Sequence, residues 1–211
     1  MSRPGATSAT SKGLRLARKA WQLLHQDSAR AIESAREALR EAQAHDDLPG
    51  RAWAQLAIGY HVLYFGTPAD AAVALKGAQA LFEQLDDRPG TILAGTGLAR
   101  CLWREGKFAE SLELVLPLRE PGLQVLQHEQ RGVLLNTIAG CYSAQGRSEQ
   151  AFAYMYQALR DSGPTHGRGF DAVLYCNLAH ELQQIGDYHE ALRYLDQGIT
   201  RCNELSNPRL L

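Results

Sequence analysis

Apolar residues recur with helical spacing along most of the chain, and short polar or glycine-containing stretches separate the apolar runs. The segment from Leu178 to Gly198 shows this arrangement clearly, because two such runs flank the dipeptide Gly186-Asp187. A glycine just past the last turn of a helix can adopt a left-handed conformation without steric cost. An aspartate in the next position can accept hydrogen bonds from backbone N–H groups at the start of a second helix. The pattern therefore predicts two antiparallel helices joined by a tight turn.

This predicted hairpin recurs upstream at an interval of 40 residues, which makes it an internal repeat. The turn column holds Gly66, Gly106, Gly146 and Gly186. Two columns of mostly small residues mark the second helix. The first column holds Ala31, Ala71, Ser111, Ala151 and Ala191. The second column, seven residues on, holds Ala38, Ala78, Leu118, Ala158 and Gly198. An apolar residue followed by a small one marks the first helix, at Ile58-Gly59, Leu98-Ala99, Ile138-Ala139 and Leu178-Ala179. We expect helices to cross closely at the small residues, because larger side chains would overpack the crossing.

These columns resemble the tetratricopeptide repeat family, whose pattern has an apolar-small pair in the first helix, a glycine between helices and small residues in the second. The resemblance covers roughly Leu14 to the C-terminus, although the period of 40 exceeds the usual ~34 residues. HEAT-type repeats have a nearer period of ~40–47 residues but lack this spacing of glycine and small residues. The resemblance implies an all-α fold, a right-handed α-α superhelix of about five helical hairpins.

The repeats divide the chain into a flexible leader over residues 1–13 and a solenoid over residues 14–211. Its units are predicted at residues 14–45, 51–85, 91–125, 130–162 and 170–205. In the third unit, Pro117 should break the second helix near residues 116–122, with Leu123 to Gln127 as a shorter helix or turn. The loosest linker is predicted at Gly163-Pro164, with Gly167 and Gly169. No polar capping helix is visible after the fifth unit, which predicts a fragment of a longer protein or self-association through the terminal helices.

Composition narrows the class of protein. Hydrophobic residues make up 45% of the chain and its formal net charge is −1, so a folded soluble protein is expected, without the basic face of a nucleic-acid binder. No apolar run approaches the ~18 residues of a membrane-spanning helix, and the N-terminus has no apolar core of a signal peptide. We therefore expect a cytoplasmic protein with neither a nucleic-acid nor a membrane partner.

No catalytic or metal-binding pattern stands out, so the residues predict neither an enzyme nor a cofactor. Gly95-Thr96-Gly97 lies inside a predicted helix and lacks the remaining residues of a phosphate loop. His180-Glu181 and His189-Glu190 lack the second histidine, four residues on, of the helical zinc motif. Cys101 and Cys141 occupy equivalent mid-helix positions and are expected to be structural thiols.

In the family that these repeats resemble, the first helices of successive repeats line the concave face, so equivalent positions should form stripes along a groove. The predicted groove residues are Tyr60, Tyr64, Arg100, Trp103, Arg104, Asn136, Asn177 and His180. Aromatic and arginine side chains often anchor binding surfaces, and Arg100 and Arg104 could jointly hold a carboxylate. The alternative is that the two tyrosines pack between repeats while the arginines form a solvated face. The family's carboxylate-clamp subtype is not matched, because Leu56, Tyr60 and Arg100 occupy its places.

The resemblance predicts a non-catalytic module that binds a peptide, a protein segment or a small ligand in its concave groove. Short acidic linkers such as Asp86-Asp87-Arg88-Pro89-Gly90 resemble those of N-terminal regulatory regions of bacterial signalling proteins, tetratricopeptide-containing diguanylate cyclases in particular. A cyclase domain would then lie beyond Leu211, because these residues carry no Gly-Gly-Asp/Glu-Glu-Phe motif. A stand-alone adaptor that scaffolds protein complexes and the sensor half of a transcription regulator are the alternatives.

Overall fold

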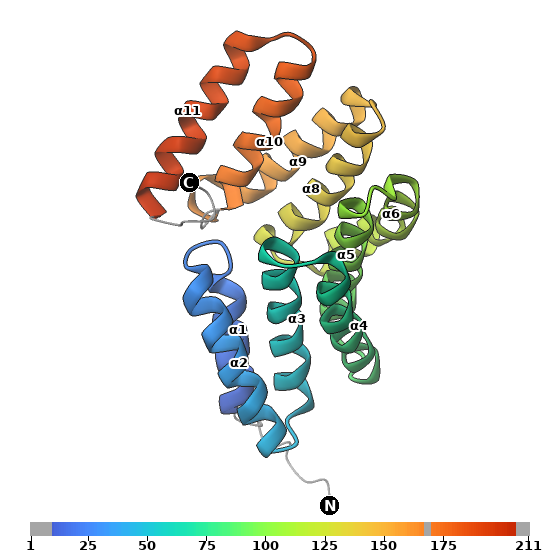
Figure 1. Ribbon diagram of the computed structural model, residues 1–211, viewed down its shortest axis with the longest axis vertical. Coiled ribbons are helices and arrows are strands. Elements are labelled where there is room, and N and C mark those ends of the chain that lie inside the picture. Colours follow the sequence, from blue (N-terminus) through green and yellow to red (C-terminus); the bar gives the residue numbers. More distant parts are fainter. Residues whose placement is uncertain (1–9, 167–169, 206–211) are drawn as a thin grey trace, which may run out of the picture.

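The computed structural model describes residues 10–166 and 170–205, and these form helices that run antiparallel in successive pairs (Figure 1). The helices are α1 (Lys12–Leu23), α2 (Ser28–Ala44), α3 (Leu48–Phe65), α4 (Pro68–Gln84), α5 (Arg88–Arg104), α6 (Phe108–Val115), α7 (Arg119–Val125), α8 (His128–Ala144), α9 (Ser148–His166), α10 (Phe170–Gln184) and α11 (Tyr188–Leu205). The predicted all-α solenoid of hairpins is confirmed. Residues 1–9 of the expected leader, Gly167 and Gly169 of the expected linker, and the last residues, 206–211, lie outside the described residues.

The 40-residue period of the sequence is also the period of the helices. The second helices of the hairpins begin at Ser28, Pro68, Phe108, Ser148 and Tyr188, at intervals of 40 residues. Among the first helices, α3, α5 and α8 keep the same interval, beginning at Leu48, Arg88 and His128. Each repeat therefore places equivalent residues at equivalent points of a hairpin, as the columns predict.

The glycine column closes most of the turns in the predicted way. Gly106, Gly146 and Gly186 have φ angles of +79°, +71° and +85°, in the left-handed region that favours glycine. Asp187 then accepts a hydrogen bond from the backbone N–H of Glu190 at 3.2 Å, which caps α11. Gly66 differs, because its φ is −122° and its backbone is extended. There Thr67 caps α4 through the N–H of Asp70, and Pro68 begins the helix, so the turn needs no left-handed residue.

The two acidic linkers share one capping arrangement. Asp46 and Asp86 adopt left-handed φ angles of +50° and +52°, which end the preceding helices. The next aspartates, Asp47 and Asp87, accept hydrogen bonds from the N–H groups of Gly50 and Gly90 at 2.9 and 3.0 Å. A proline follows in the first turn, where its missing N–H costs no helical hydrogen bond. The repeated sequence thus encodes a helix stop and a helix start in five residues.

The second helix of the third hairpin is broken, as Pro117 predicts. α6 ends at Val115, and a short 3-10 turn (Leu116–Leu118) containing Pro117 leads into α7. α7 begins at Arg119, earlier than the Leu123 expected from the sequence, because Pro121 falls in its first turn and is tolerated there.

The expected end of the fourth unit near residue 162 is wrong, because α9 continues through Gly163 and Pro164 to His166. Pro164 lies in the last turn of α9. It therefore removes one backbone hydrogen bond at the end of the helix, where few further helical hydrogen bonds follow that it could interrupt.

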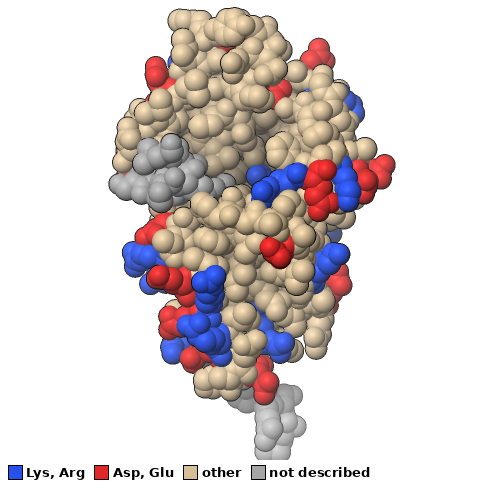
Figure 2. Space-filling view, viewed as in Figure 1, with Lys and Arg blue, Asp and Glu red and all other residues tan. Residues whose placement is uncertain are grey.

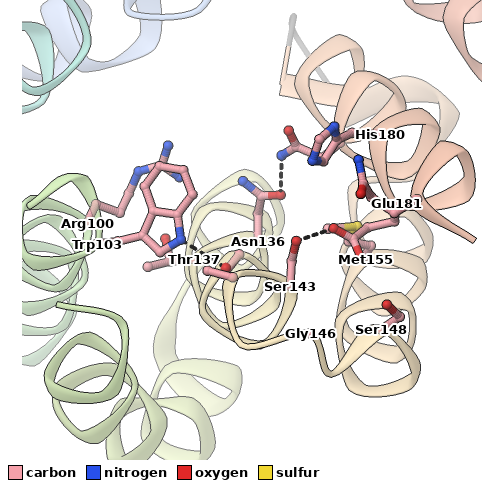
Figure 3. A pocket seen from close by; sticks show the side chains of 14 residues that line it. Arg100, Trp103, Asn136, Thr137, Ser143, Gly146, Ser148, Met155, His180 and Glu181 are labelled. Atoms are coloured by element: carbon pink, nitrogen blue, oxygen red, sulfur yellow. Dashed lines mark hydrogen bonds between the residues drawn. The ribbon is translucent and has the colours of Figure 1, made fainter. Parts of the chain in front are cut away.

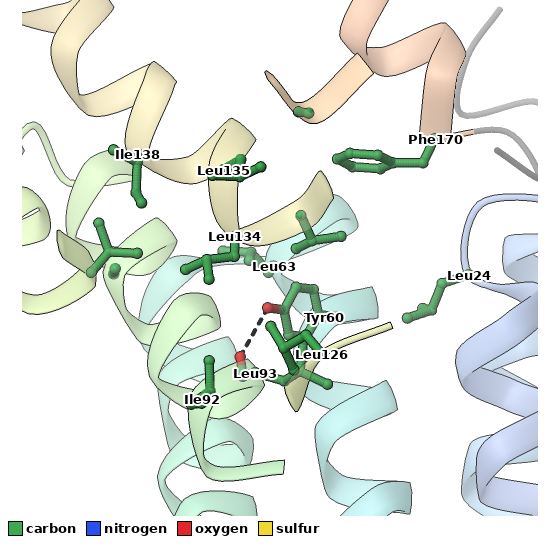
Figure 4. Close-up of a cluster of buried hydrophobic side chains, with 14 of the residues drawn as sticks. Leu24, Tyr60, Leu63, Ile92, Leu93, Leu126, Leu134, Leu135, Ile138 and Phe170 are labelled. Carbon is green, nitrogen blue, oxygen red and sulfur yellow. Dashed lines mark hydrogen bonds between the residues drawn. The ribbon is translucent and has the colours of Figure 1, made fainter. Parts of the chain in front are cut away.

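A buried cluster at the centre of the superhelix joins its first and last hairpins (Figure 4). The ring of Phe170, at the start of α10, lies 5.2 Å from the ring of His25, which follows α1, and both residues are buried. Leu24, Tyr60 and Leu134 are buried in the same cluster. In most solenoids each repeat contacts only its neighbours, so this contact between distant repeats closes the superhelix tightly. Among the described helices, none is both long and apolar enough to cross a membrane.

Candidate functional site

A pocket of about 460 Å³ lies between α5, α8, α9 and α10, along the inner side of the third, fourth and fifth hairpins (Figure 3). Its polar lining consists of Arg100, Trp103, Asn136, Thr137, Ser143, Ser148, Asn177, His180, Glu181 and Gln184. Except for Ser148 on α9, these side chains come from the first helices of three successive repeats, because the inner sides of the stacked first helices lie next to one another.

The pocket brings together most of the residues predicted for a groove. Arg100, Trp103, Asn136, Asn177 and His180 all line it. Three of the predicted residues, Tyr60, Tyr64 and Arg104, do not.

Tyr60 belongs to the interior of the protein. Its side chain is fully buried, and its hydroxyl donates a hydrogen bond to the carbonyl oxygen of Leu93 at 2.9 Å. Burial raises the pKa of this hydroxyl well above its ordinary value. Tyr64 is half-buried, with its ring 5.7 Å from the ring of His25. The two tyrosines therefore pack between repeats, which was the alternative to a place in the groove, because the tight superhelix covers the inner side of α3.

Arg104 also has a structural role, which corrects the expectation that Arg100 and Arg104 jointly hold a carboxylate. The Arg104 guanidinium donates hydrogen bonds to the carbonyl oxygens of Leu63 and, at 3.0 Å, of Gly66. These carbonyls belong to the end of α3, where helical backbone acceptors have no partner within the helix. Arg104 consequently ties α5 to α3, and Arg100 alone of the two faces the pocket.

Arg100 keeps its guanidinium available to the pocket. Its central carbon lies 5.7 Å from the ring centre of Tyr64, which is a cation–π contact. Within the described residues, Arg100 forms no ion pair. The Tyr64 ring therefore positions a cation whose N–H donors remain open to a ligand.

Trp103 forms one wall of the pocket. Its indole Nε1 donates a hydrogen bond to the carbonyl oxygen of Gly140 at 2.9 Å, which joins α5 to α8. The side chain is 39% exposed, whereas Trp21 and Trp53 are buried. Trp103 is thus the tryptophan whose surroundings a pocket ligand would change most.

Two asparagines from neighbouring repeats meet inside the pocket. The Asn177 Nδ2 donates to the Oδ1 of Asn136 at 2.8 Å, and Asn136 is only 4% exposed. In this arrangement the Asn136 NH₂ and the Asn177 carbonyl oxygen have no hydrogen-bond partner among the described residues. The pair therefore presents one donor group and one acceptor group side by side (Figure 3).

Glu181 is a pocket residue that the sequence analysis missed. It is 2% exposed, and its carboxylate accepts a hydrogen bond from the hydroxyl of Ser143. No lysine, arginine or histidine of the described part of the chain forms an ion pair with it. The sequence does carry a signal, because Glu181 follows Cys101 and Cys141 in one repeat column. A charged residue in a column of buried thiols indicates a buried charge.

The chemistry of the pocket lining follows from the groups that it contains. The described residues contain no group of three or more histidine, cysteine, aspartate or glutamate side chains able to hold a metal ion. Burial raises the pKa of the Cys101 thiol to about 11, so it is not a ready nucleophile. What the pocket offers is a cation, a buried carboxylate and an amide pair, all supplied by rigid helices.

Comparison with known proteins agrees with the architecture. Residues 130–204, which form α8 to α11, match the family model described as tetratricopeptide repeat. No curated protein sequence matches the chain.

Solved structures match over nearly the whole chain. A Rap protein complexed with the competence and sporulation factor is 14% identical, with a TM-score of 0.72, and the match covers 93% of this chain and 57% of that one. PlcR of Bacillus thuringiensis, in complex with the peptide PapR7 and DNA, is 10% identical with a TM-score of 0.71, over 92% and 71% of the two chains. Tetratricopeptide-like repeats of a Podosopora anserina putative kinesin light chain are 20% identical with a TM-score of 0.53, and the match covers 92% of this chain and 94% of that one.

At these identities the likeness concerns the fold, which is that of a tetratricopeptide-like solenoid. The chain spans little more than half the length of the Rap protein, 57%.

Proposed function

We propose that this chain is a non-catalytic binding module that holds an extended peptide or protein segment in the pocket between α5, α8 and α10. The observation that carries the proposal is the amide pair of Asn136 and Asn177, which leaves one donor group and one acceptor group facing the pocket. Each peptide unit of an extended chain has one N–H and one carbonyl oxygen that need partners when they are buried. The amide pair can supply both partners to any peptide sequence.

The structural neighbours support this proposal. The Rap structure holds the competence and sporulation factor, and the PlcR structure holds the peptide PapR7. PlcR, which shares the fold of this chain, is thus in complex with a peptide, and the present chain has a polar pocket along the inner side of its hairpins.

Within this proposal, the module is the regulatory or sensor region of a larger bacterial, cytoplasmic signalling protein, with an output domain such as a diguanylate cyclase beyond Leu211. The likeness of its acidic linkers to those of such regulatory regions supports this assignment. A stand-alone adaptor is the alternative, and the two differ in mass. An antibody against the chain should detect, in extract of the source cells, a protein much larger than 23.2 kDa. A band at 23.2 kDa would favour the adaptor.

The PlcR complex also contains DNA, which raises the question of a nucleic-acid partner. Lysine and arginine side chains alternate with aspartate and glutamate over the lower part of the face in Figure 2, and the formal net charge is −1. A DNA-binding surface usually gathers basic residues on one face. We therefore propose a peptide partner, and not a DNA partner, for these residues.

Fluorescence of Trp103 tests the peptide proposal. The wild-type protein, immobilised, should retain members of a library of short random peptides. A retained peptide should protect the wild-type protein from acrylamide quenching, since Trp103 is exposed while Trp21 and Trp53 are buried. The protection should disappear in Trp103→Phe. In Asn177→Ala, which removes half of the amide pair, about ten times more peptide should be needed for the same protection. Failure of the wild-type protein to retain any peptide would contradict the proposal.

The outer face of α11 supports a second proposal, that two copies of the chain associate. Its exposed apolar residues follow one another at intervals of three and four residues, namely Tyr188, Leu192, Leu195 and Ile199. This spacing is typical of helices that pair along an apolar seam. Charges of both signs, including Arg193 and Asp196, flank the row, so an antiparallel second copy can bring opposite charges together.

Light scattering after size-exclusion chromatography tests this association. The wild-type protein should have about twice the mass of one chain, which is 23.2 kDa. Leu192→Glu should shift it to a single chain, because a charge in the seam would be buried without a partner. The matched control is Val73→Glu on α4, which replaces an even more exposed apolar residue (74% against 62%) and should leave the mass unchanged. A wild-type mass of one chain at high concentration would rule out this association.

A further inference from the structure

Two opposite charges face the pocket from opposite sides. Figure 3 shows Arg100 on α5 at one side and Glu181 on α10 at the other, with Asn136 between them on α8. Neither charge is neutralised by an ion pair within the described residues, and they do not pair with each other. The pocket is therefore electrically polar along the direction from α5 to α10.

Of the two charged groups, Glu181 has the greater need of a partner of opposite charge. The residue is 2% exposed, so little water reaches the carboxylate, and within the described part of the chain it accepts one hydrogen bond, from Ser143. A buried carboxylate costs free energy unless it is paired with a cation or fully hydrogen-bonded. One hydroxyl donor satisfies only part of the acceptor capacity of two carboxylate oxygens. No described residue pairs with this carboxylate, so a cationic group of a ligand could form its ion pair.

The repeat pattern indicates that Glu181 is not needed for packing alone. The equivalent positions in the two preceding repeats hold Cys101 and Cys141, both buried thiols that pack without any charge. Cys141 also contacts a serine hydroxyl, that of Ser111 at 3.1 Å. Packing at this point of the hairpin therefore does not require a carboxylate.

We propose that Glu181 binds a cationic nitrogen of the ligand, either the ammonium or guanidinium group of a basic side chain or a free amino terminus, while Arg100 binds a carboxylate of the same ligand. The inference rests on the proposed peptide-binding function and names the class of peptide and its direction. The basic group lies toward α10, the acidic group lies toward α5, and the amide pair holds the backbone between them. An ion pair at a buried carboxylate such as that of Glu181 is stronger than one at an open surface.

Affinity selection tests the proposal. Libraries of short random peptides, with free or acetylated amino termini and with free or amidated carboxyl termini, are passed over immobilised wild-type protein and over Glu181→Gln. Glutamine keeps an oxygen acceptor for Ser143, so the variant should fold, and a thermal melt by circular dichroism checks this. Peptides retained by the wild-type protein should be enriched in Lys, Arg or a free amino terminus, and Glu181→Gln should reduce that enrichment about tenfold or more. The acetylated library distinguishes a basic side chain from the terminus.

Two further variants complete the experiment. Arg100→Gln should remove the preference for Asp, Glu or a free carboxyl terminus and leave the preference for basic groups. Glu83→Gln is the matched control, because it makes the same change at an exposed position of α4 outside the pocket, and should alter neither preference.

The outcomes separate this inference from the function on which it rests. If the wild-type protein retains peptides that depend on Asn177, yet Glu181→Gln retains the same set, the charge assignment is wrong and peptide binding stands. Retention without any preference for basic groups also overturns the assignment. If the wild-type protein retains no peptide, both proposals fail together.

Discussion

Phe170→Ala should lower the free energy of unfolding by about 3–5 kcal/mol, as expected for removing a buried aromatic ring. Phe170 is 1% exposed and lies in the central cluster, with its ring 5.2 Å from that of His25. Its removal would leave a cavity between the first and fifth hairpins, which lie far apart in the sequence. The loss should therefore exceed what a solenoid with contacts only between neighbouring repeats would show.

Urea unfolding followed by circular dichroism measures the effect. Phe65→Ala is the control, because Phe65 is 50% exposed on α3 and its replacement should change stability by no more than about 0.5 kcal/mol. A double-mutant cycle with His25→Ala should give a coupling of about 0.5–1.5 kcal/mol, the range for paired rings. Equal losses for Phe170→Ala and Phe65→Ala would show that the superhelix does not close through this contact.

Gly90→Ala should destabilise the protein by about 1–3 kcal/mol through overpacking. A Cβ atom on Gly90 would lie 2.2 Å from the Cδ1 atom of Phe82, and Phe82 is fully buried. The ring cannot retreat without disturbing its neighbours, among them Trp53, whose ring centre is 5.5 Å away. The capping of α5 by Asp87 should survive, so the loss reports on packing.

The control for this prediction is another helical glycine, Gly140 on α8. A Cβ atom there would meet nothing closer than 3.7 Å, an ordinary contact with the indole of Trp103. Gly140→Ala should therefore be neutral or gain up to about 1 kcal/mol, because alanine loses less backbone entropy in a helix. Thermal melts compare the stabilities of the two variants. A melting temperature of Gly90→Ala equal to that of the wild-type protein would contradict the close packing of the linker against α4.

Much of the architecture follows from local chemistry and could be predicted from the sequence. Left-handed glycines, aspartate caps and first-turn prolines act through atoms a few residues apart, so their effects do not depend on distant packing. The break at Pro117 belongs to the same class. The predicted end of the fourth unit near residue 162 is too early, because a proline in the last turn of a helix costs little and α9 continues past Pro164 to His166.

The pocket could be predicted only in part. The repeat period places Arg100, Asn136, Asn177 and His180 on the inner side of their helices, and they do line one pocket. The same period places Tyr60 and Arg104 there too, yet Tyr60 is buried and Arg104 binds the end of α3. Periodicity identifies the side of a helix and says nothing of what covers that side.

By itself, the sequence determined the helices, their turns, their pairing into hairpins and the 40-residue register that aligns equivalent positions. The tertiary structure alone decided that the superhelix closes from Phe170 onto His25, and that Glu181 is a buried charge inside a pocket. The physical reason is that curvature is the sum of small rotations between successive repeats. Each rotation depends on how whole helix faces pack, and their sum determines which inner residues are buried and which remain open to a ligand.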